Sequence, residues 1–152
     1  MLAAKPASKK AKKAVYANFI HSAIMPFPQP SPAPDFPHKG VLDGVSFTEG
    51  ASDLSLTSKQ RLQPLIDELI AQSDVRIAVM AHTDNRGPAV ANEHLSIARA
   101  NAVVEHLVGN GVSANRLTSE GYGETLPLVQ NVTAKDRQRN RRVEIRVLGA
   151  DL

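Results

Sequence analysis

Two hydrophobic periods alternate along this chain, and this alternation is the feature that most constrains its fold. Val75, Ile77 and Val79 stand at every second position, as in a strand that is buried on one face. Glu93–Val108 follows the three- and four-residue spacing of a helix, and Gly109 supplies a stop signal. Strands are expected at Val41–Phe47, Val75–Met80, Leu117–Tyr122 and Arg142–Leu148, and helices at Ser58–Gln72 and Glu93–Val108. This β-α-β-α-β-β order predicts an α+β domain in which two main helices pack on a mixed four-stranded sheet.

Local signals predict where the two helices begin. Thr57 and Gln60 resemble a capping box at the start of the first helix. Pro64 lies inside this helix and is expected to kink it or to delay its true start. Asn92 is expected to be the N-cap of the second helix, since its short polar side chain can accept from the first free N–H groups.

Residues 1–37 differ in composition from the rest of the chain. Six of the ten prolines lie between Pro26 and Pro37, nearly one at every second position, which predicts an extended spacer. Five lysines and no acid lie in residues 1–20, so the formal net charge of +3 hides an acidic remainder with 13 bases and 15 acids. We expect residues 1–37 to be a basic, Pro-rich tail or linker, and residues 38–152 to be the folded domain. Ala14–Met25 only faintly resembles a signal peptide, because Asn18 and His21 interrupt it.

Several classes of function lack their residues in this sequence. There is no cysteine, which removes disulfides and thiolate metal sites. His82 and Asp84 do not make a zinc site, and Asp84–Gly87 is not a calcium loop, because Arg86 stands where an oxygen ligand is required. No nucleophile elbow or phosphate-binding loop is present. We therefore expect no metal, no cofactor and no enzymatic activity, and no nucleic-acid partner, since aromatic residues are scarce among the bases.

Four polar side chains are the candidate binding residues. Asp84 follows a strand, and Asn92, Ser96 and Arg99 lie on one stripe of the following helix, within about 40° of one another. One interpretation is a solvated face with a surface ion pair between Asp84 and Arg99, worth about 0–1 kcal/mol. The other is a pocket in which the carboxylate takes an ammonium group and the guanidinium takes a carboxylate of one zwitterionic ligand.

Two arginines at the start of the last strand, Arg141 and Arg142, are expected to point to opposite faces of it. Arg141 shares the side of Val143, so it is either buried with a partner or directed into a cleft, whereas Arg142 is expected at the surface. His82 is expected to be a loop histidine that hydrogen-bonds the turn.

These residues belong to motifs that resemble those of one known family, and the resemblance extends over about residues 41–148. The motifs are His82-Thr83-Asp84-Asn85, Leu95-Ser96, Ala98-Arg99-Ala100, Gly121-Tyr122-Gly123-Glu124 and Asn140-Arg141-Arg142-Val143-Glu144, with Gly87, Asn92, Pro127 and Asn131 between them. They are similar in identity and order to the OmpA-like C-terminal domain.

The resemblance implies non-covalent binding of peptidoglycan through the meso-diaminopimelate of its peptide stem. Asp84 would take the ammonium and Arg99 the carboxylate of the free amino-acid end. Thr83 and Asn92 would shape the pocket, and Arg141 would line its far side. The expected location is the periplasm, in association with the cell envelope.

Three departures from the family pattern bear on this expectation. Ala81 replaces a glycine before His82, and Thr48 and Gly50 stand where the family often has polar side chains, so binding could be weakened or retuned. The alternative function is a docking subunit of an envelope machine, such as a stator or secretion system, with weak or no wall binding. In that case the Pro-rich tail would run to other envelope proteins.

Overall fold

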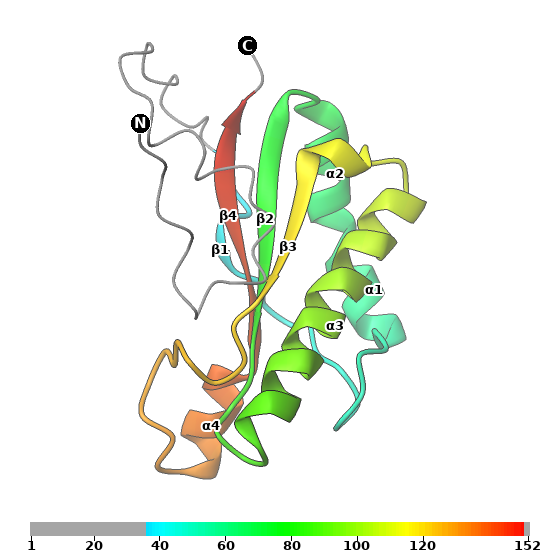
Figure 1. Ribbon diagram of the computed structural model, residues 1–152. Coiled ribbons are helices and arrows are strands. Elements are labelled where there is room, and N and C mark those ends of the chain that lie inside the picture. The colour runs from blue at the N-terminus through cyan, green and yellow to red at the C-terminus, as the bar shows by residue number, and fades with distance from the viewer. Residues whose placement is uncertain (1–35, 151–152) are drawn as a thin grey trace, which may run out of the picture.

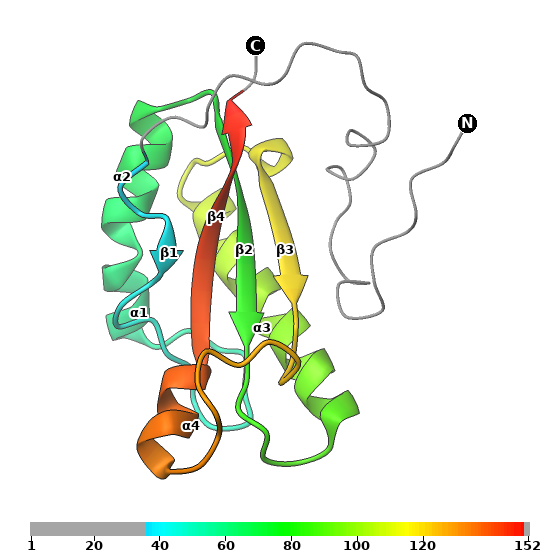
Figure 2. The same ribbon diagram turned by 90° about the vertical axis from the view of Figure 1, so that its left-hand side faces the viewer.

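The structure, a computed structural model, describes residues 36–150 and contains one mixed four-stranded sheet. The strands are β1 (Gly40–Val41), β2 (Val75–His82), β3 (Leu117–Gly121) and β4 (Arg142–Ala150), and they lie in the order β1-β4-β2-β3 (Figure 2). β2 runs parallel to β3 and antiparallel to β4, and β1 is antiparallel to β4. The predicted α+β architecture, with two main helical segments between the first three strands, is confirmed.

Three helices cover one face of this sheet, namely α1 (Leu56–Arg61), α2 (Gln63–Ala71) and α3 (Ala89–Gly109) (Figure 1). The inward side of β2 provides the centre of the core, which is completed by the apolar sides of α2, α3 and β4. Its fully buried members include Leu65, Ile66, Leu69, Ile77, Val79, Val103, Leu107, Val143 and Ile145. Burial of this apolar face is the main force that holds the helices on the sheet.

The single helix predicted at Ser58–Gln72 is wrong, because two helices meet at Leu62. Pro64 lies in the first turn of α2, where its missing N–H costs no hydrogen bond, whereas a continuous helix would bring its ring against the carbonyl of Gln60. The capping box predicted at Thr57 is also wrong. Ser55 is the N-cap of α1, and its side chain accepts from the N–H of Ser58.

The strand predicted at Val41–Phe47 is much shorter than expected. Only Gly40–Val41 pairs with β4, and Phe47 makes a separate bridge with Leu54. Gly44 has a φ of 77°, which turns the chain away from an extended path. Val45 is still buried in the core, so the apolar alternation reported the burial correctly but not the pairing.

The second main helix begins earlier than predicted. Its N-cap is Pro88, and the backbone N–H of Asn92 donates to the Pro88 carbonyl within the first turn. Asn92 is therefore an internal residue of α3, and the prediction that it caps the helix is wrong. The side chain of Asn92 is consequently available for the site rather than for the cap.

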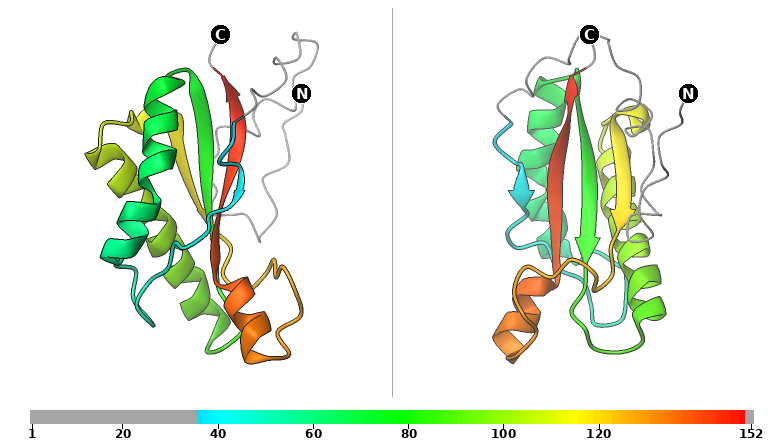
Figure 3. Two further views of the ribbon diagram at one scale, coloured as in Figure 1. Left: turned by 180° about the vertical axis from the view of Figure 1, so that it is seen from behind. Right: turned by 60° about the vertical axis from the view of Figure 1, so that its left-hand side comes forward.

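One α-helix was not predicted, α4 (Ala134–Asn140), which lies at the end of the sheet where β4 begins (Figure 3). It starts with a complete capping box between Thr133 and Asp136, a signal that the sequence does contain. Most of the tail predicted at residues 1–37 lies outside the described residues, so the domain boundary stays a prediction. Phe36 is fully buried in the core. Among the helices of residues 36–150, none has the length and apolar character needed to cross a membrane.

Candidate functional site

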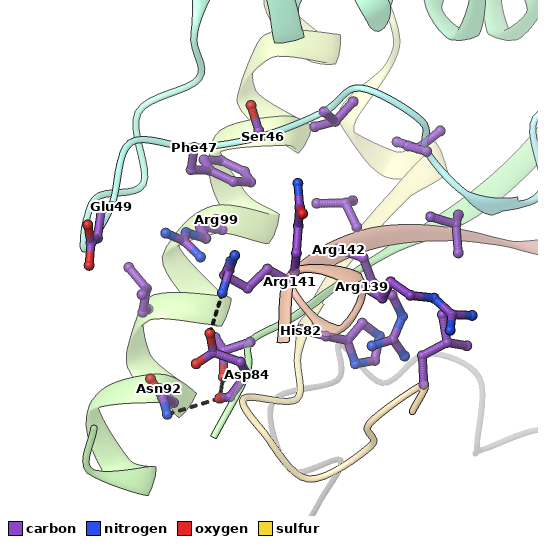
Figure 4. A pocket seen from close by; sticks show the side chains of 18 of the residues that line it. Ser46, Phe47, Glu49, His82, Asp84, Asn92, Arg99, Arg139, Arg141 and Arg142 are labelled. Atoms are coloured by element: carbon purple, nitrogen blue, oxygen red, sulfur yellow. Dashed lines mark hydrogen bonds and ion pairs between the residues drawn. The ribbon is translucent and has the colours of Figure 1, made fainter. Parts of the chain in front are cut away.

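A cleft of about 1030 Å³ opens at the end of the sheet where β2 ends and β4 begins. Its walls come from the loop after β1, the loop between β2 and α3, the first half of α3, and the segment from α4 into β4 (Figure 4). The five predicted site residues Thr83, Asp84, Asn92, Arg99 and Arg141 line this cleft, whereas Ser96 of the same polar stripe does not. The fold therefore brings together residues that lie up to 58 positions apart in sequence.

Asp84 lies just after β2 and is 7% exposed. One carboxylate oxygen accepts the N–H of Arg86 at 2.9 Å, which fixes the turn that leads into α3. The other oxygen accepts from Nη1 of Arg141 at 2.5 Å. No ion pair joins Asp84 to Arg99 within the described part of the chain.

Arg99 reaches across from the middle of α3 to the loop after β1. Its Nε donates to the Ala51 carbonyl at 2.9 Å and its Nη2 to the Thr48 carbonyl at 3.4 Å. The guanidinium also lies 4.9 Å from the centre of the Phe47 ring, as in a cation–π contact. Burial lowers the pKa of Arg99, the nearby charge of Arg141 lowers it further, and Asp84 opposes both effects. Arg99 is thus held firmly on one side and faces the cleft on the other.

The polar stripe of α3 is buried rather than solvated, so the interpretation as a solvated face is wrong. Asn92, Ser96 and Arg99 are exposed by 7% or less. The amide of Asn92 donates to the carbonyls of Arg86 and Asp84 and to the carboxylate of Glu124. Asn92 therefore shapes the loop that carries the Asp84 carboxylate.

Thr83 also stabilises this loop. Its hydroxyl donates to the Asp84 carbonyl at 2.8 Å, and its N–H donates to the Gly123 carbonyl at 2.9 Å. Gly121 allows the same region to close tightly on α3, because a Cβ there would lie 2.4 Å from the backbone nitrogen of Ile97. The Gly121-Tyr122-Gly123 motif is therefore a site of close helix–strand contact.

Arg141 precedes β4 and is directed into the cleft, which is one of its two predicted positions, whereas the surface position predicted for Arg142 is wrong. Arg141 is the C-cap of α4 rather than a strand residue, and its side chain is 43% exposed above Asp84. Arg142 is not a surface side chain, because it is only 7% exposed. It donates to the carboxylate of Glu144 and to the carbonyls of Asn140 and Leu126, which explains its burial.

His82 is the last residue of β2 and is not the loop histidine that was predicted. It stacks on Tyr122 with ring centroids 5.4 Å apart, and neither ring nitrogen has a hydrogen-bond partner within residues 36–150. Burial lowers the pKa of His82 to about 4, the charge of Arg142 lowers it as well, and Glu144 raises it. His82 is therefore an uncharged wall of the cleft at neutral pH.

Sequence reasoning missed the loop that forms the far wall of the cleft. Ser46, Phe47, Glu49 and Gly50 all line it, and Phe47 contacts the Arg99 guanidinium. The sequence signal was available in part, since Thr48 and Gly50 lie in this loop. Thr48 takes part through its carbonyl, which accepts from Arg99, and not through its side chain.

A comparison with family models identifies the class of this domain. The model of the OmpA family matches residues 46–141, which include all five predicted site residues. The chain therefore belongs to the OmpA family.

Individual relatives match the same region. The peptidoglycan-binding protein ArfA of Mycobacterium tuberculosis is 34% identical over 101 residues, which cover 66% of this chain and 31% of ArfA. Outer membrane protein A of Bordetella avium is 35% identical over 124 residues, covering 81% of this chain and 63% of that protein. The solved structure of the cell wall anchor of the T6SS from Pseudomonas aeruginosa is 33% identical, with a TM-score of 0.61, and covers 69% of this chain and 75% of that one. The chain spans about a third of ArfA and under two thirds of the Bordetella protein.

Proposed function

We propose that this domain binds peptidoglycan non-covalently through the free amino-acid end of meso-diaminopimelate in the peptide stem. In this proposal Asp84 receives the ammonium group and Arg99 receives the carboxylate. Asn92 and Thr83 hold the loop that presents Asp84, and Arg141 lines the cleft next to that carboxylate. The domain thereby anchors an envelope protein or complex to the wall, from the periplasmic side, and turns nothing over.

The observation that carries this proposal is the separation of Asp84 and Arg99 within one cleft. Each lies on a different element, each is fixed by its own hydrogen bonds, and neither pairs with the other. A zwitterion supplies one cation and one anion at the distance set by a single carbon atom, so it can satisfy both groups together. The planar, two-pronged guanidinium is also the side chain best suited to a carboxylate.

The names of the relatives give independent support. ArfA is described as peptidoglycan-binding, and the Pseudomonas structure is that of a cell wall anchor. From this likeness and from the cleft chemistry we infer that this chain binds the wall, lies in the envelope and has no catalytic activity. The choice of diaminopimelate rests on the cleft chemistry and on the resemblance of the motifs.

Co-sedimentation with purified sacculi tests the proposal. Asp84→Asn and Arg99→Met should each reduce the bound fraction at least tenfold, because each removes one charged partner of the ligand. Arg146→Met is a matched control, since Arg146 pairs with Glu120 at 2.8 Å and its side chain is 45% exposed, yet it does not line the cleft. Thermal unfolding of each variant shows that the fold is retained. Undiminished binding of both cleft variants would overturn the proposal.

Competition by soluble ligands tests the chemistry of the stem. Free diaminopimelate and a diaminopimelate stem peptide should displace the protein from sacculi. A lysine-type stem, which lacks the second carboxylate, should compete poorly. If the wild-type protein does not sediment with sacculi at physiological salt unless a partner complex is added, the docking role considered from the sequence is the better account.

A further inference from the structure

The carboxylate of Asp84 already holds a cation in this structure, the guanidinium of Arg141. Nη1 of Arg141 lies 2.5 Å from Oδ2 of Asp84, and Figure 4 shows the arginine reaching over the carboxylate from the end of α4. Any ammonium group that binds Asp84 must therefore take the place of this guanidinium or share the carboxylate with it.

The attachment of Arg141 suits a side chain that can be displaced. The bond to Asp84 is the one hydrogen bond that its guanidinium makes within residues 36–150. By contrast, the guanidinium of its neighbour Arg142 donates three hydrogen bonds and is almost completely buried. Only the arginine side of this pair is exposed, so water can solvate Arg141 when it leaves, whereas the buried Asp84 carboxylate needs another cation in its place.

A second guanidinium lies close enough to interact with Arg141. The positive charge of Arg141 lowers the pKa of Arg99, and both side chains line the cleft (Figure 4). Two cations thus share the single carboxylate of Asp84 in this part of the cleft. A carboxylate brought between them would relieve their repulsion and gain two donors.

This inference rests on the proposed function. We propose that Arg141 is a specificity-determining residue, which discriminates between ligands by exchanging its partner. It occupies Asp84 in the free protein, is displaced by the ligand ammonium, and then moves to the ligand carboxylate beside Arg99. A ligand with both groups replaces every interaction that it breaks. A ligand with only an amine breaks the pair of Asp84 and Arg141 and leaves two guanidinium groups without an anion.

This proposal predicts opposite effects of one substitution on two ligands. In Arg141→Met, a lysine-type stem should bind about fivefold more tightly than to wild type, because the internal competitor is gone. A diaminopimelate stem should bind several-fold more weakly, because one donor to its carboxylate is lost. The preference for diaminopimelate should therefore fall about tenfold or more. Isothermal titration with the two stem peptides measures both affinities.

A second variant separates the two roles of Arg141. Arg141→Lys keeps a cation that can occupy Asp84 but removes the two-pronged donor. It should leave the lysine-type stem as weakly bound as in wild type while weakening the diaminopimelate stem. Arg146→Met again serves as the matched control and should leave both affinities unchanged.

Two results would overturn the inference. One is an unchanged preference in Arg141→Met. The other is a preference that falls only because the diaminopimelate stem weakens, with no gain for the lysine-type stem, since this would make Arg141 a plain carboxylate ligand. Asp84→Asn distinguishes these results from failure of the proposed function. If that variant loses diaminopimelate binding while the Arg141 variants behave like wild type, the function stands and the exchange does not occur.

Discussion

Arg99 and Arg116 show how the same type of side chain can have different roles in two regions of this fold. Both are 7–8% exposed, and both donate to backbone carbonyls more than 40 positions away in sequence. Arg116 donates to three carbonyls, those of Leu69, Gln72 and Val75, at 2.6–2.9 Å, and so ties the end of α2 to the start of β2. Arg99 has one short bond and one long bond and faces the cleft. A guanidinium with three short bonds to carbonyls stabilises the fold, whereas one held on a single side remains able to bind.

The largest effect on stability is expected from Arg116→Met. The three carbonyls would lose the guanidinium as a donor, and the two bonds to Leu69 and Val75 are buried, whereas the Gln72 carbonyl still accepts from the N–H of Val75. Because an unsatisfied buried carbonyl costs about 1–3 kcal/mol, we expect the free energy of unfolding to fall by about 3 kcal/mol. Urea denaturation measures this change. Sacculus binding per folded molecule should be unaffected, and a loss of binding without a loss of stability would contradict the division between the two arginines.

A smaller loss is expected from Gly121→Ala, which strains the contact between β3 and α3 at the cleft end. The new Cβ would lie 2.4 Å from a backbone nitrogen, so one element must shift, at about 2 kcal/mol. Gly109→Ala is the matched control, since a Cβ there has no atom within 4 Å. Thermal unfolding should show a lower midpoint for Gly121→Ala and no decrease in midpoint for Gly109→Ala. Equal midpoints for the two variants would show that the close approach is not required.

The cleft, unlike the region around Arg116, should also make the stability of the folded protein depend on pH. His82 has a pKa of about 4 in the folded protein, against 6.5 for an ordinary histidine. Between these values the unfolded chain binds a proton that the folded protein does not, so stability is complete above pH 6.5 and falls as pH decreases toward 4. The loss should be about 3 kcal/mol at most.

The substitution His82→Phe, which keeps an aromatic ring against Tyr122, should flatten the slope between pH 6.5 and 4 in urea denaturation. Arg116→Met should lower the whole curve without changing its slope in this range. If His82→Phe retained the full wild-type slope, the burial of His82 would not be the cause of the pH dependence.

The smallest effect on stability is expected from Arg99→Met, at about 1 kcal/mol. Its carbonyl partners border an open cleft, so water can replace the lost donors, and the Thr48 carbonyl still accepts from the N–H of Ala51. The same variant should show the largest loss of wall binding. Urea denaturation beside co-sedimentation gives both numbers, and a destabilisation as large as that of Arg116→Met would remove the contrast between these residues.

The sequence predicted the fold where one period was uninterrupted. Val75, Ile77 and Val79 form β2, and the alternation of Val143 and Ile145 identifies β4. Periodicity failed where a single residue overrides it, as at Pro64, which separates two helices, and Gly44, which ends a strand early. In these places a backbone constraint outweighs the apolar pattern.

The cleft was predictable to the extent that its residues share one local element. Asn92 and Arg99 are related by helical spacing, and Asp84 precedes the same helix. The pair of Asp84 and Arg141 spans 57 positions, and no local pattern reports it. The wall at Phe47 is irregular backbone, and its contact with Arg99 depends on tertiary packing alone.

The central claim is that Arg99 and Asp84 each hold one end of a single zwitterion. Titration of diaminopimelate and lysine-type stems into wild type and Arg99→Met, followed by chemical shift changes so that weak binding is measurable, tests this claim most directly. The lysine-type stem, which lacks the ligand carboxylate, should bind wild type at least tenfold more weakly than the diaminopimelate stem. In Arg99→Met, the logarithm of this affinity ratio should be less than half its wild-type value. An equal penalty in both proteins would show that the carboxylate is bound elsewhere.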